Sequence, residues 1–376
     1  MKKIVLGSLF SGIGAIEFAL RRLGIDYDVA FACDNGEREV SYDLKNELKE
    51  LEKITEIPKK TEYINSLYNR LTKKENYIEK TYLNNYGDKV SFDNFYQDIY
   101  LLNGLDYRHK VDLLVGGSPC QSFSTVGKQL GLKDTRGTLF YEFARLVKEI
   151  EPKVFIYENV RGLLTNDKGN TFKTILHILN DELHYHISYD VFNATEFGIP
   201  QNRRRLIIVG TKDNFNFDVK NIQRKNLNKT MQDFLEDNCK DGCFKYRKGG
   251  DIVILKQPGT PNPKAILSPL VTKYVLKGGT KNFYTKPVTD LPIARTLLKT
   301  MGNHHRAGVD NYITIGKEKN IYRALTPREC LRLMGFTDDF QFPDIPWSKM
   351  YMQAGNSIVV DLLMAVIKSL RKEEIL

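Results

Sequence analysis

Strand and helix patterns alternate from the start of the chain, and few folds accommodate that alternation. An apolar strand is expected over residues 4–9, then the turn FSGIG, an amphipathic helix over 15–23 and a second strand over 29–32. The same signals recur later, as buried-strand runs over 111–115, 154–157 and 206–209 and a helical stretch over 139–150. Strands that alternate with helices predict an α/β fold with a doubly wound, mainly parallel sheet.

The 376 residues exceed the usual size of one domain, and the composition changes along the chain. From about residue 213 the apolar runs become irregular, and residues 212–290 carry about 15 Lys and Arg against about 8 acids. We therefore expect a first domain over 1–212 and 323–376, and a smaller, loop-rich, basic domain over 213–322. The polar stretch 41–95 is interpreted as an insert of solvated helices, with a DNA-contacting or partner-binding segment as the alternative.

Composition narrows the class of protein. Hydrophobic residues make up 41% and charged residues 27%, which excludes a disordered chain or a disulfide scaffold. The net charge of +10 favours a polyanionic partner, nucleic acid first, with a merely basic surface as the alternative. Five scattered cysteines indicate free thiols in a reducing compartment, so the cytoplasm is the expected location. No run approaches 18 uninterrupted apolar residues, and no membrane span is predicted.

The glycine turn is a candidate ligand loop. Gly12 and Gly14 let the backbone pass close to a bound molecule at the expected N-terminus of a helix, although a structural turn fits them equally well. Asp34 strengthens the ligand interpretation, because a carboxylate about 20 residues after such glycines accepts hydrogen bonds from ribose hydroxyls in this fold. Asp98 precedes the third strand and could serve the same ligand.

Reactive side chains are found beside three other strands. Cys120 follows one strand within the polar sequence GGSPCQSFS, a setting that favours a functional over a structural thiol. Glu158 directly follows the next strand and is a candidate to donate or accept a proton, with an exposed loop carboxylate as the alternative. Arg203 and Arg205 precede a further strand, and a cationic cluster entering a sheet requires carboxylates or phosphates nearby.

Together these motifs resemble the DNA cytosine methyltransferases that alkylate carbon 5 of the base, as found in bacterial restriction-modification systems. FSGIG is similar to that family's cofactor loop, GGSPCQSFS to its nucleophile loop, ENV to its acid motif, QNRRR to its arginine motif, TPRECLRLMGF to the block after the recognition domain and QAGNS to its closing motif. The six motifs keep the family's order and cover most of the chain outside the inserts. The resemblance implies a Rossmann-like, S-adenosylmethionine-dependent methyltransferase fold, with the basic second domain as target-recognition domain.

The resemblance also implies roles for individual residues. Cys120 would add to carbon 6 of cytosine, Glu158 would hold the ring nitrogen and exocyclic amine, and Arg205 would contact the base carbonyl while Arg203 braces the pocket. S-adenosylmethionine is the implied methyl donor, and the residues expected to bind it are Phe10, Gly12, Ile13, Gly14, Asp34, Asp98, Ile99, Pro119 and Asn356. The residues expected to bind the DNA are Gln121, Ser124, Gln201 and Thr296.

The implied substrate is double-stranded DNA with the target cytosine flipped out of the helix. We expect a monomeric, bacterial or phage-encoded enzyme, with a restriction endonuclease that acts on the same site as partner. No metal is expected, because the cysteines and histidines at 239, 243, 304 and 305 lack a standard ligand spacing. Two alternatives stay open. One is a transfer-RNA cytosine-5 methyltransferase of the same fold, which the long basic segment disfavours; the other is a catalytically silent DNA-binding homologue, which the intact Cys120, Glu158 and Arg205 disfavour.

Overall fold

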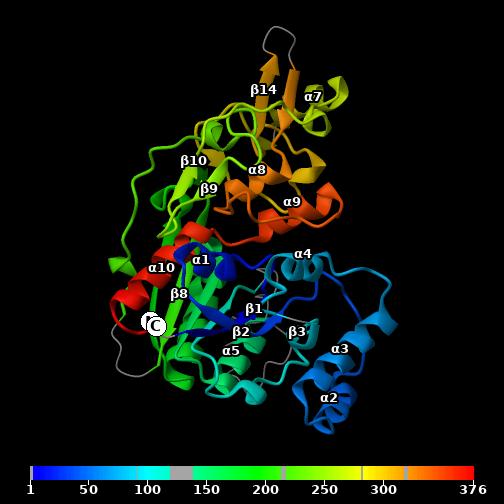
Figure 1. Ribbon diagram of the computed structural model, residues 1–376, viewed down its shortest axis with the longest axis vertical. Helices are drawn as coiled ribbons and strands as arrows, with labels where there is room; N and C mark the ends of the chain where they lie inside the picture. Colours follow the sequence, from blue (N-terminus) through cyan, green and yellow to red (C-terminus); the bar gives the residue numbers. More distant parts are fainter. Residues whose placement is uncertain (1–2, 91, 119–138, 213–216, 281–282, 317–320) are drawn as a thin grey trace.

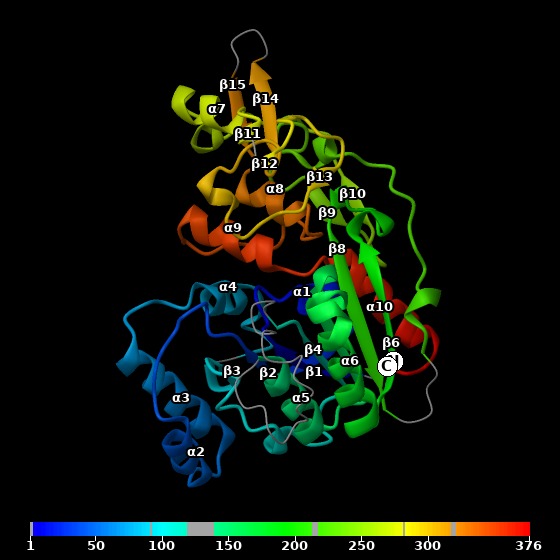
Figure 2. The same cartoon turned by 180° about the vertical axis from the view of Figure 1, so that it is seen from behind.

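A computed structural model describes residues 3–90, 92–118, 139–212, 217–280, 283–316 and 321–376. Its centre is a seven-stranded sheet with the order β3-β2-β1-β4-β5-β8-β6 (Figures 1 and 2). The strands are β1 (Ile4–Leu9), β2 (Tyr27–Cys33), β3 (Phe95–Tyr96), β4 (Leu113–Gly116), β5 (Val154–Val160), β6 (His186–Asn193) and β8 (Arg204–Thr211). Strand β8 runs antiparallel to both of its neighbours, and the other pairs are parallel. The predicted doubly wound, mainly parallel sheet is confirmed.

Helices cover both faces of this sheet because successive strand residues point to opposite sides. In β5, Ile156 packs on one face and Phe155 on the other. The first face carries α1 (Ala15–Leu23) and α10 (Val360–Lys372). The second face carries α5 (Leu139–Ile150) and α6 (Asn170–His177). Two apolar cores therefore enclose the sheet and hold the ends of its strands in place.

A second region lies above the sheet in Figures 1 and 2 and has little regular structure. Its elements are β9 (Phe244–Tyr246), β10 (Ile252–Ile254), α7 (Pro269–Val275), β11 (Gly279–Thr280), β12 (Phe283–Tyr284), β13 (Ala294–Arg295), β14 (Tyr312–Gly316), β15 (Ile321–Ala324), α8 (Pro327–Arg332) and α9 (Trp347–Asn356). It is joined to the sheet by the short parallel pair of β13 with β7 (Gln201–Asn202). Phe18 of α1 also stacks on Phe336, with ring centroids 5.0 Å apart. The two regions thus share a continuous apolar core.

The segment expected as an insert forms three helices, α2 (Leu44–Glu52), α3 (Ile57–Leu71) and α4 (Tyr77–Tyr86). The expectation of solvated helices holds for much of α2, where Leu48 is exposed. Helices α3 and α4 are solvated on one face only, because Ile64 and Tyr82 on the other face are fully buried. These helices pack beside β3 and α1 and form part of the protein core.

The segment Trp347–Lys372 is long and apolar enough to cross a membrane by length and composition alone. It consists of two helices, α9 and α10, and 72% of its most apolar window is buried inside the protein. These are the properties of core helices in a folded domain.

Candidate functional site

The glycine turn after β1 has a backbone that other residues adopt with difficulty. Gly12 has φ 52° and Gly14 has φ 77°, both in the left-handed region that favours glycine. A Cβ at Gly14 would lie 2.2 Å from the ring of Tyr86, which packs against the turn from α4. Phe10 also has a positive φ, 50°. The turn is therefore tightly constrained, and α1 begins directly after it.

Asp34 closes this turn from the end of β2. One carboxylate oxygen accepts a hydrogen bond from the Gly12 amide at 3.0 Å, and the other accepts one from the Gly36 amide at 2.9 Å. Desolvation raises the pKa of Asp34, and the two backbone hydrogen bonds offset part of that rise. Each carboxylate oxygen keeps acceptor capacity for a ligand hydroxyl.

A pocket opens between the glycine turn and the start of α10. Its walls are residues 8–13, 15, 16, 115, 116 and 356–358. It thus includes Phe10, Ile13 and Asn356, which the sequence predicts as cofactor contacts. The Ser11 hydroxyl is buried in the wall and has no hydrogen-bond partner among the described residues. An unpaired buried hydroxyl is costly, so the pocket is suited to a ligand with a polar group.

Asp98 lies on the neighbouring strand edge and is almost fully buried. One oxygen accepts hydrogen bonds from the hydroxyls of Tyr42 at 2.5 Å and Tyr68 at 2.7 Å. The other accepts from the Tyr100 amide at 2.9 Å. Burial raises the pKa of Asp98, and these hydrogen bonds counteract the rise. Next to it, the Ile99 carbonyl accepts a hydrogen bond from an arginine of α5, which fixes the backbone of this corner.

Glu158 and Arg205 form an ion pair farther along the same edge of the sheet. The register of β5 and β8 sets Glu158 opposite Ile207, so Arg205, two residues away, points to the same face. The Arg205 Nε atom lies 2.9 Å from Glu158 Oε1, and the two side chains are 16% and 14% exposed. The pair is thus accessible from one side, as a substrate site requires.

The chain that leads to the predicted nucleophile passes directly over Glu158. A Cβ at Gly117 would lie 2.9 Å from the Glu158 carbonyl oxygen and 3.1 Å from its Oε2 atom, so glycine permits the close approach. Asn159 donates a hydrogen bond to the Ser118 carbonyl at 3.0 Å. Pro119, Cys120, Gln121 and Ser124 lie outside the described residues. The last described residues of this segment, Gly117 and Ser118, therefore lie next to the acid.

Arg203 and Gln201 join the sheet to the second region. The buried Arg203 guanidinium donates to the carbonyls of Leu297, Gly355 and Ser357 at 2.9 to 3.1 Å. Burial, and to a smaller degree the nearby Arg205 charge, lowers the pKa of Arg203 to about 9. Gln201 is fully buried, donates to the Leu333 carbonyl and accepts from the Leu297 amide.

Thr296 is half-buried on the stretch that follows β13. Its hydroxyl donates a 2.6 Å hydrogen bond to the Asn202 carbonyl. Asn356 donates to Glu37 at 3.1 Å across the mouth of the glycine pocket. Both side chains thus lie at the junction of the two regions.

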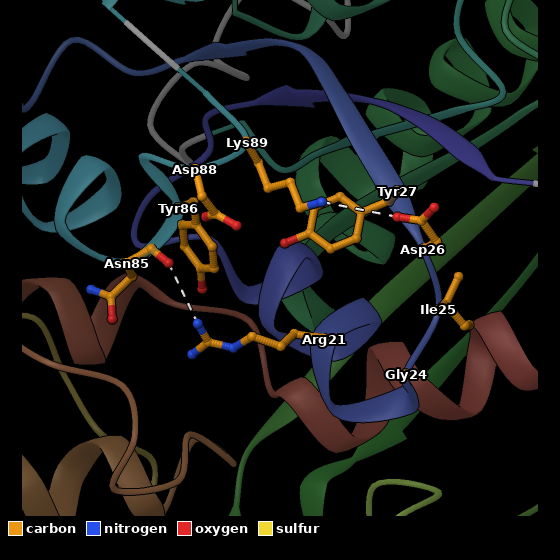
Figure 3. Close-up of a pocket in the computed structure, with 9 residues that line it drawn as sticks. All are labelled: Arg21, Gly24, Ile25, Asp26, Tyr27, Asn85, Tyr86, Asp88 and Lys89. Carbon is orange, nitrogen blue, oxygen red and sulfur yellow. Dashed lines mark hydrogen bonds and ion pairs between the residues drawn. The ribbon is translucent and has the colours of Figure 1, made fainter.

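A larger hollow of about 350 Å³ lies at the opposite edge of the sheet, between the end of α1, the start of β2 and the end of α4 (Figure 3). Its charged side chains already meet partners: Arg21 donates to the Asn85 carbonyl, and Lys89 lies 3.9 Å from Asp26. It contains none of the predicted site residues. Across the described ranges, no group of three or more His, Cys, Asp or Glu is arranged as a metal site.

Sequence reasoning missed the groups that support the site. Gly117 and Asn159 belong to the motifs that carry Cys120 and Glu158, so the motif itself was the available signal. Ser11 lies inside the glycine turn and could have been found in the same way. Tyr42 precedes α2, while Tyr68 and Tyr86 lie in α3 and α4, and no local pattern connects them to the carboxylate or the turn they contact.

Comparisons with known proteins agree with this geometry. Residues 70–372 match the family described as C-5 cytosine-specific DNA methylase. The chain is 35% identical over 311 residues to Type II methyltransferase M1.ScrFI of Lactococcus lactis subsp. cremoris, and the aligned region covers 82% of this chain and 73% of that protein. It is 34% identical over 306 residues to Type II methyltransferase M.NgoBI of Neisseria gonorrhoeae, covering 78% and 83%. The solved Entamoeba histolytica methyltransferase EhMeth shares the fold, with a TM-score of 0.65, 17% identity and coverage of 100% and 99%.

The fold is therefore that of the S-adenosylmethionine-dependent methyltransferases. The chain belongs to the C-5 cytosine-specific DNA methylase family and is a DNA (cytosine-5)-methyltransferase of the restriction-modification type.

Proposed function

We propose that this enzyme transfers a methyl group from S-adenosylmethionine to carbon 5 of a flipped-out cytosine within a specific double-stranded DNA sequence. One observation carries the proposal. The glycine pocket and the Glu158–Arg205 pair lie on the same strand edge, and β4 runs between them toward Cys120. A methyl donor and an acceptor base bound at these two places would meet beside the nucleophile loop.

Cys120 supplies the covalent chemistry. Carbon 5 of cytosine is a weak nucleophile, so the Cys120 thiolate first adds to carbon 6, and the ring becomes an enamine that is nucleophilic at carbon 5. Once carbon 5 carries the methyl group, a base removes its remaining proton. The electron pair of that carbon–hydrogen bond re-forms the ring double bond and expels the Cys120 thiolate.

Glu158 and Arg205 stabilise the charge that develops on the base. Glu158 can hold the ring nitrogen and exocyclic amine and share a proton with the ring as the thiolate adds. Arg205 can donate to the base carbonyl, because its guanidinium has five N–H donors and the ion pair uses few of them. Arg203 braces the wall of the pocket through the Leu297 and Ser357 carbonyls that it holds.

The glycine pocket suits S-adenosylmethionine in the chemistry of its walls. The unpartnered Ser11 hydroxyl offers a polar contact in the wall, Phe10 and Ile13 offer apolar ones, and the Asp34 carboxylate lies next to the wall on the Gly12 amide. Asp34 would accept from the ribose hydroxyls, and Asp98 with Ile99 would hold another part of the same molecule. When bound, the sulfonium group of S-adenosylmethionine supplies an electrophilic methyl group.

The second region would hold the DNA. A base inside a duplex cannot reach either pocket, so the target nucleotide must rotate out of the helix. The basic 212–290 segment can neutralise phosphates, and side chains of this region, with Gln121, Ser124 and Thr296, would support recognition. The buried Gln201 would instead hold the two regions together. We further propose a monomeric cytoplasmic enzyme that protects the site cleaved by a cognate restriction endonuclease.

Methyl transfer tests the proposal directly. The purified protein, with tritiated S-adenosylmethionine, should label duplex DNA and leave transfer RNA unlabelled. Cys120→Ser should reduce labelling at least about 1,000-fold and keep the affinity for S-adenosylhomocysteine, because it removes only the nucleophile. Sequencing of methylated cytosines would then give the recognition site. Labelled RNA with unlabelled DNA, or full activity of Cys120→Ser, would overturn the proposal.

A further inference from the structure

The insert helices contact three of the elements that surround the proposed cofactor site. Figures 1 and 2 show α2, α3 and α4 at the end of the sheet that carries β3. The Tyr86 hydroxyl at the end of α4 donates to the Gly14 carbonyl at 2.7 Å. Asn76, the N-cap of α4, donates to the Asp34 carbonyl at 2.9 Å. Tyr42 and Tyr68 donate to the Asp98 carboxylate. The insert therefore reaches the turn, the second strand and the third strand together.

The contact with Asp98 is the strongest of the three. Asp98 is 5% exposed and Tyr68 is 3% exposed, so their hydrogen bond is shielded from water. Both tyrosine hydroxyls meet the same oxygen, Oδ2. The other oxygen, Oδ1, accepts from the Tyr100 amide and keeps a free lone pair. Two donors on one oxygen fix the plane of the carboxylate and therefore the direction of that lone pair.

A cation could in principle orient the Asp98 carboxylate in place of the tyrosines, but the neighbouring cation, an arginine of α5, already has other partners. Arg145 of α5 forms ion pairs with Glu142 and Glu149, at 2.8 Å in each case. It also donates to the carbonyls of Ile99 and Leu102. Cys33 contributes no charge, because burial raises the pKa of its thiol well above the usual range. The tyrosines are thus the side chains that orient the Asp98 carboxylate in the described part of the chain.

The arrangement does not follow from the family match. That match begins at residue 70, so both Tyr42 and Tyr68 lie before it. The tyrosines lie 56 and 30 residues from Asp98 in the sequence. A merely structural insert would satisfy its own hydroxyls internally, as Tyr63 does with Glu47 at 2.6 Å. Tyr42 and Tyr68 instead reach the residue expected to bind the cofactor.

We propose that the insert is part of the cofactor site, with Tyr42 and Tyr68 as positioning residues that orient Asp98 toward S-adenosylmethionine. This inference rests on the proposed function, because it takes S-adenosylmethionine as the ligand near Asp98. Each hydroxyl removes rotational freedom from the carboxylate, so less freedom is lost when the ligand binds. The insert would thus increase cofactor affinity without contacting DNA.

The experiment replaces each hydroxyl and keeps the ring. Tyr42→Phe, Tyr68→Phe and the double variant are compared with Tyr63→Phe, which removes a hydrogen bond of the same chemistry elsewhere in the insert. S-adenosylhomocysteine affinity is measured by calorimetry, and KM for S-adenosylmethionine and for duplex DNA is measured by methyl transfer. Tyr68→Phe should weaken cofactor binding about tenfold, with a larger loss in the double variant. KM for DNA should stay within about twofold of the parent value in the Tyr42 and Tyr68 variants. Tyr63→Phe should keep cofactor affinity and both KM values within about twofold of the parent protein.

The outcomes separate this inference from the proposed function. If the parent protein fails to bind S-adenosylhomocysteine, the proposed function and this inference both fail. If the parent binds and methylates but Tyr42→Phe and Tyr68→Phe leave cofactor affinity unchanged, the inference alone is wrong. A lower melting temperature with unchanged cofactor affinity also overturns it, because that result assigns the tyrosines a purely structural role.

Discussion

The two halves of the strand edge that carries the site are built with different electrostatics. On the half proposed to bind the cofactor, here called the cofactor half, Asp34 and Asp98 accept hydrogen bonds from neutral donors, namely backbone amides and tyrosine hydroxyls. On the half proposed to bind the base, here called the base half, Glu158 pairs with the full positive charge of Arg205. The first half keeps its negative charge for a ligand, whereas the second is nearly neutral until a substrate separates its charges.

This difference indicates how each half works. A carboxylate held by neutral donors is already oriented and can accept a ligand hydrogen bond at once. An ion pair must share or exchange its partners when a base enters, and the new contacts then form as charge develops on the base. The cofactor half is therefore organised for binding, and the base half for chemistry.

The largest effect should come from the base half. Glu158→Gln removes the negative charge and the shared proton, so the single-turnover methylation rate should fall about 100- to 1,000-fold. S-adenosylhomocysteine affinity should stay unchanged, because Glu158 pairs with Arg205 on the base half of the edge. A normal turnover rate combined with a raised KM for the cofactor would show instead that Glu158 acts in cofactor binding.

A second substitution tests the contact between the sheet and the second region. Arg203→Lys replaces a guanidinium that serves three buried carbonyls with a group of different geometry. The free energy of unfolding should fall by about 2 kcal/mol, measured by denaturant titration. Arg204→Lys, at an exposed neighbouring position, is the control and should change little. Equal stability of both variants would mean that Arg203 does not hold the regions together.

The smallest effect is the pH dependence of cofactor binding. The pKa of Asp34 and of Asp98 is raised by desolvation, so each takes up a proton at a higher pH than an ordinary aspartate. Protonation removes the charged acceptor, so affinity is complete above the raised pKa and falls as the pH decreases through it. Calorimetry from neutral to acid pH should show this decrease. Asp34→Asn should weaken cofactor binding about tenfold at neutral pH, and its affinity should decrease less steeply toward acid pH. If the pH profile of Asp34→Asn equals that of the parent protein, Asp34 is not the group that titrates.

Much of the sheet could be predicted because it depends on local periodicity. The expected strand at 4–9 and the helices at 15–23 and 139–150 coincide with β1, α1 and α5. A capping box also starts α8, with Thr326 and Glu329 each bonding the other's backbone amide. Such features depend on side chains a few residues apart, which a single sequence displays.

The supporting contacts could not be predicted because they join distant segments. A tyrosine hydroxyl that reaches Asp98 leaves no periodic pattern, and an insert rich in Lys and Glu has the composition of a solvated surface. Gln201 shows the same limit. It stands in an arginine motif and suggests contact with DNA, yet its amide is buried and engaged at both ends within the protein.

The walls of the glycine pocket determine when the pocket can form during synthesis of the chain. Its walls come from residues 8–16 and from residues 356–358, which are translated at very different times. Because synthesis proceeds from the N-terminus, residues 8–16 are made first. The pocket cannot close until residues 356–358 follow, when almost all of the described chain has been made. A ribosome-bound fragment that ends before residue 356 therefore cannot form the pocket. Chains that end earlier would lack this pocket, and the second region is already made by the time the pocket can form.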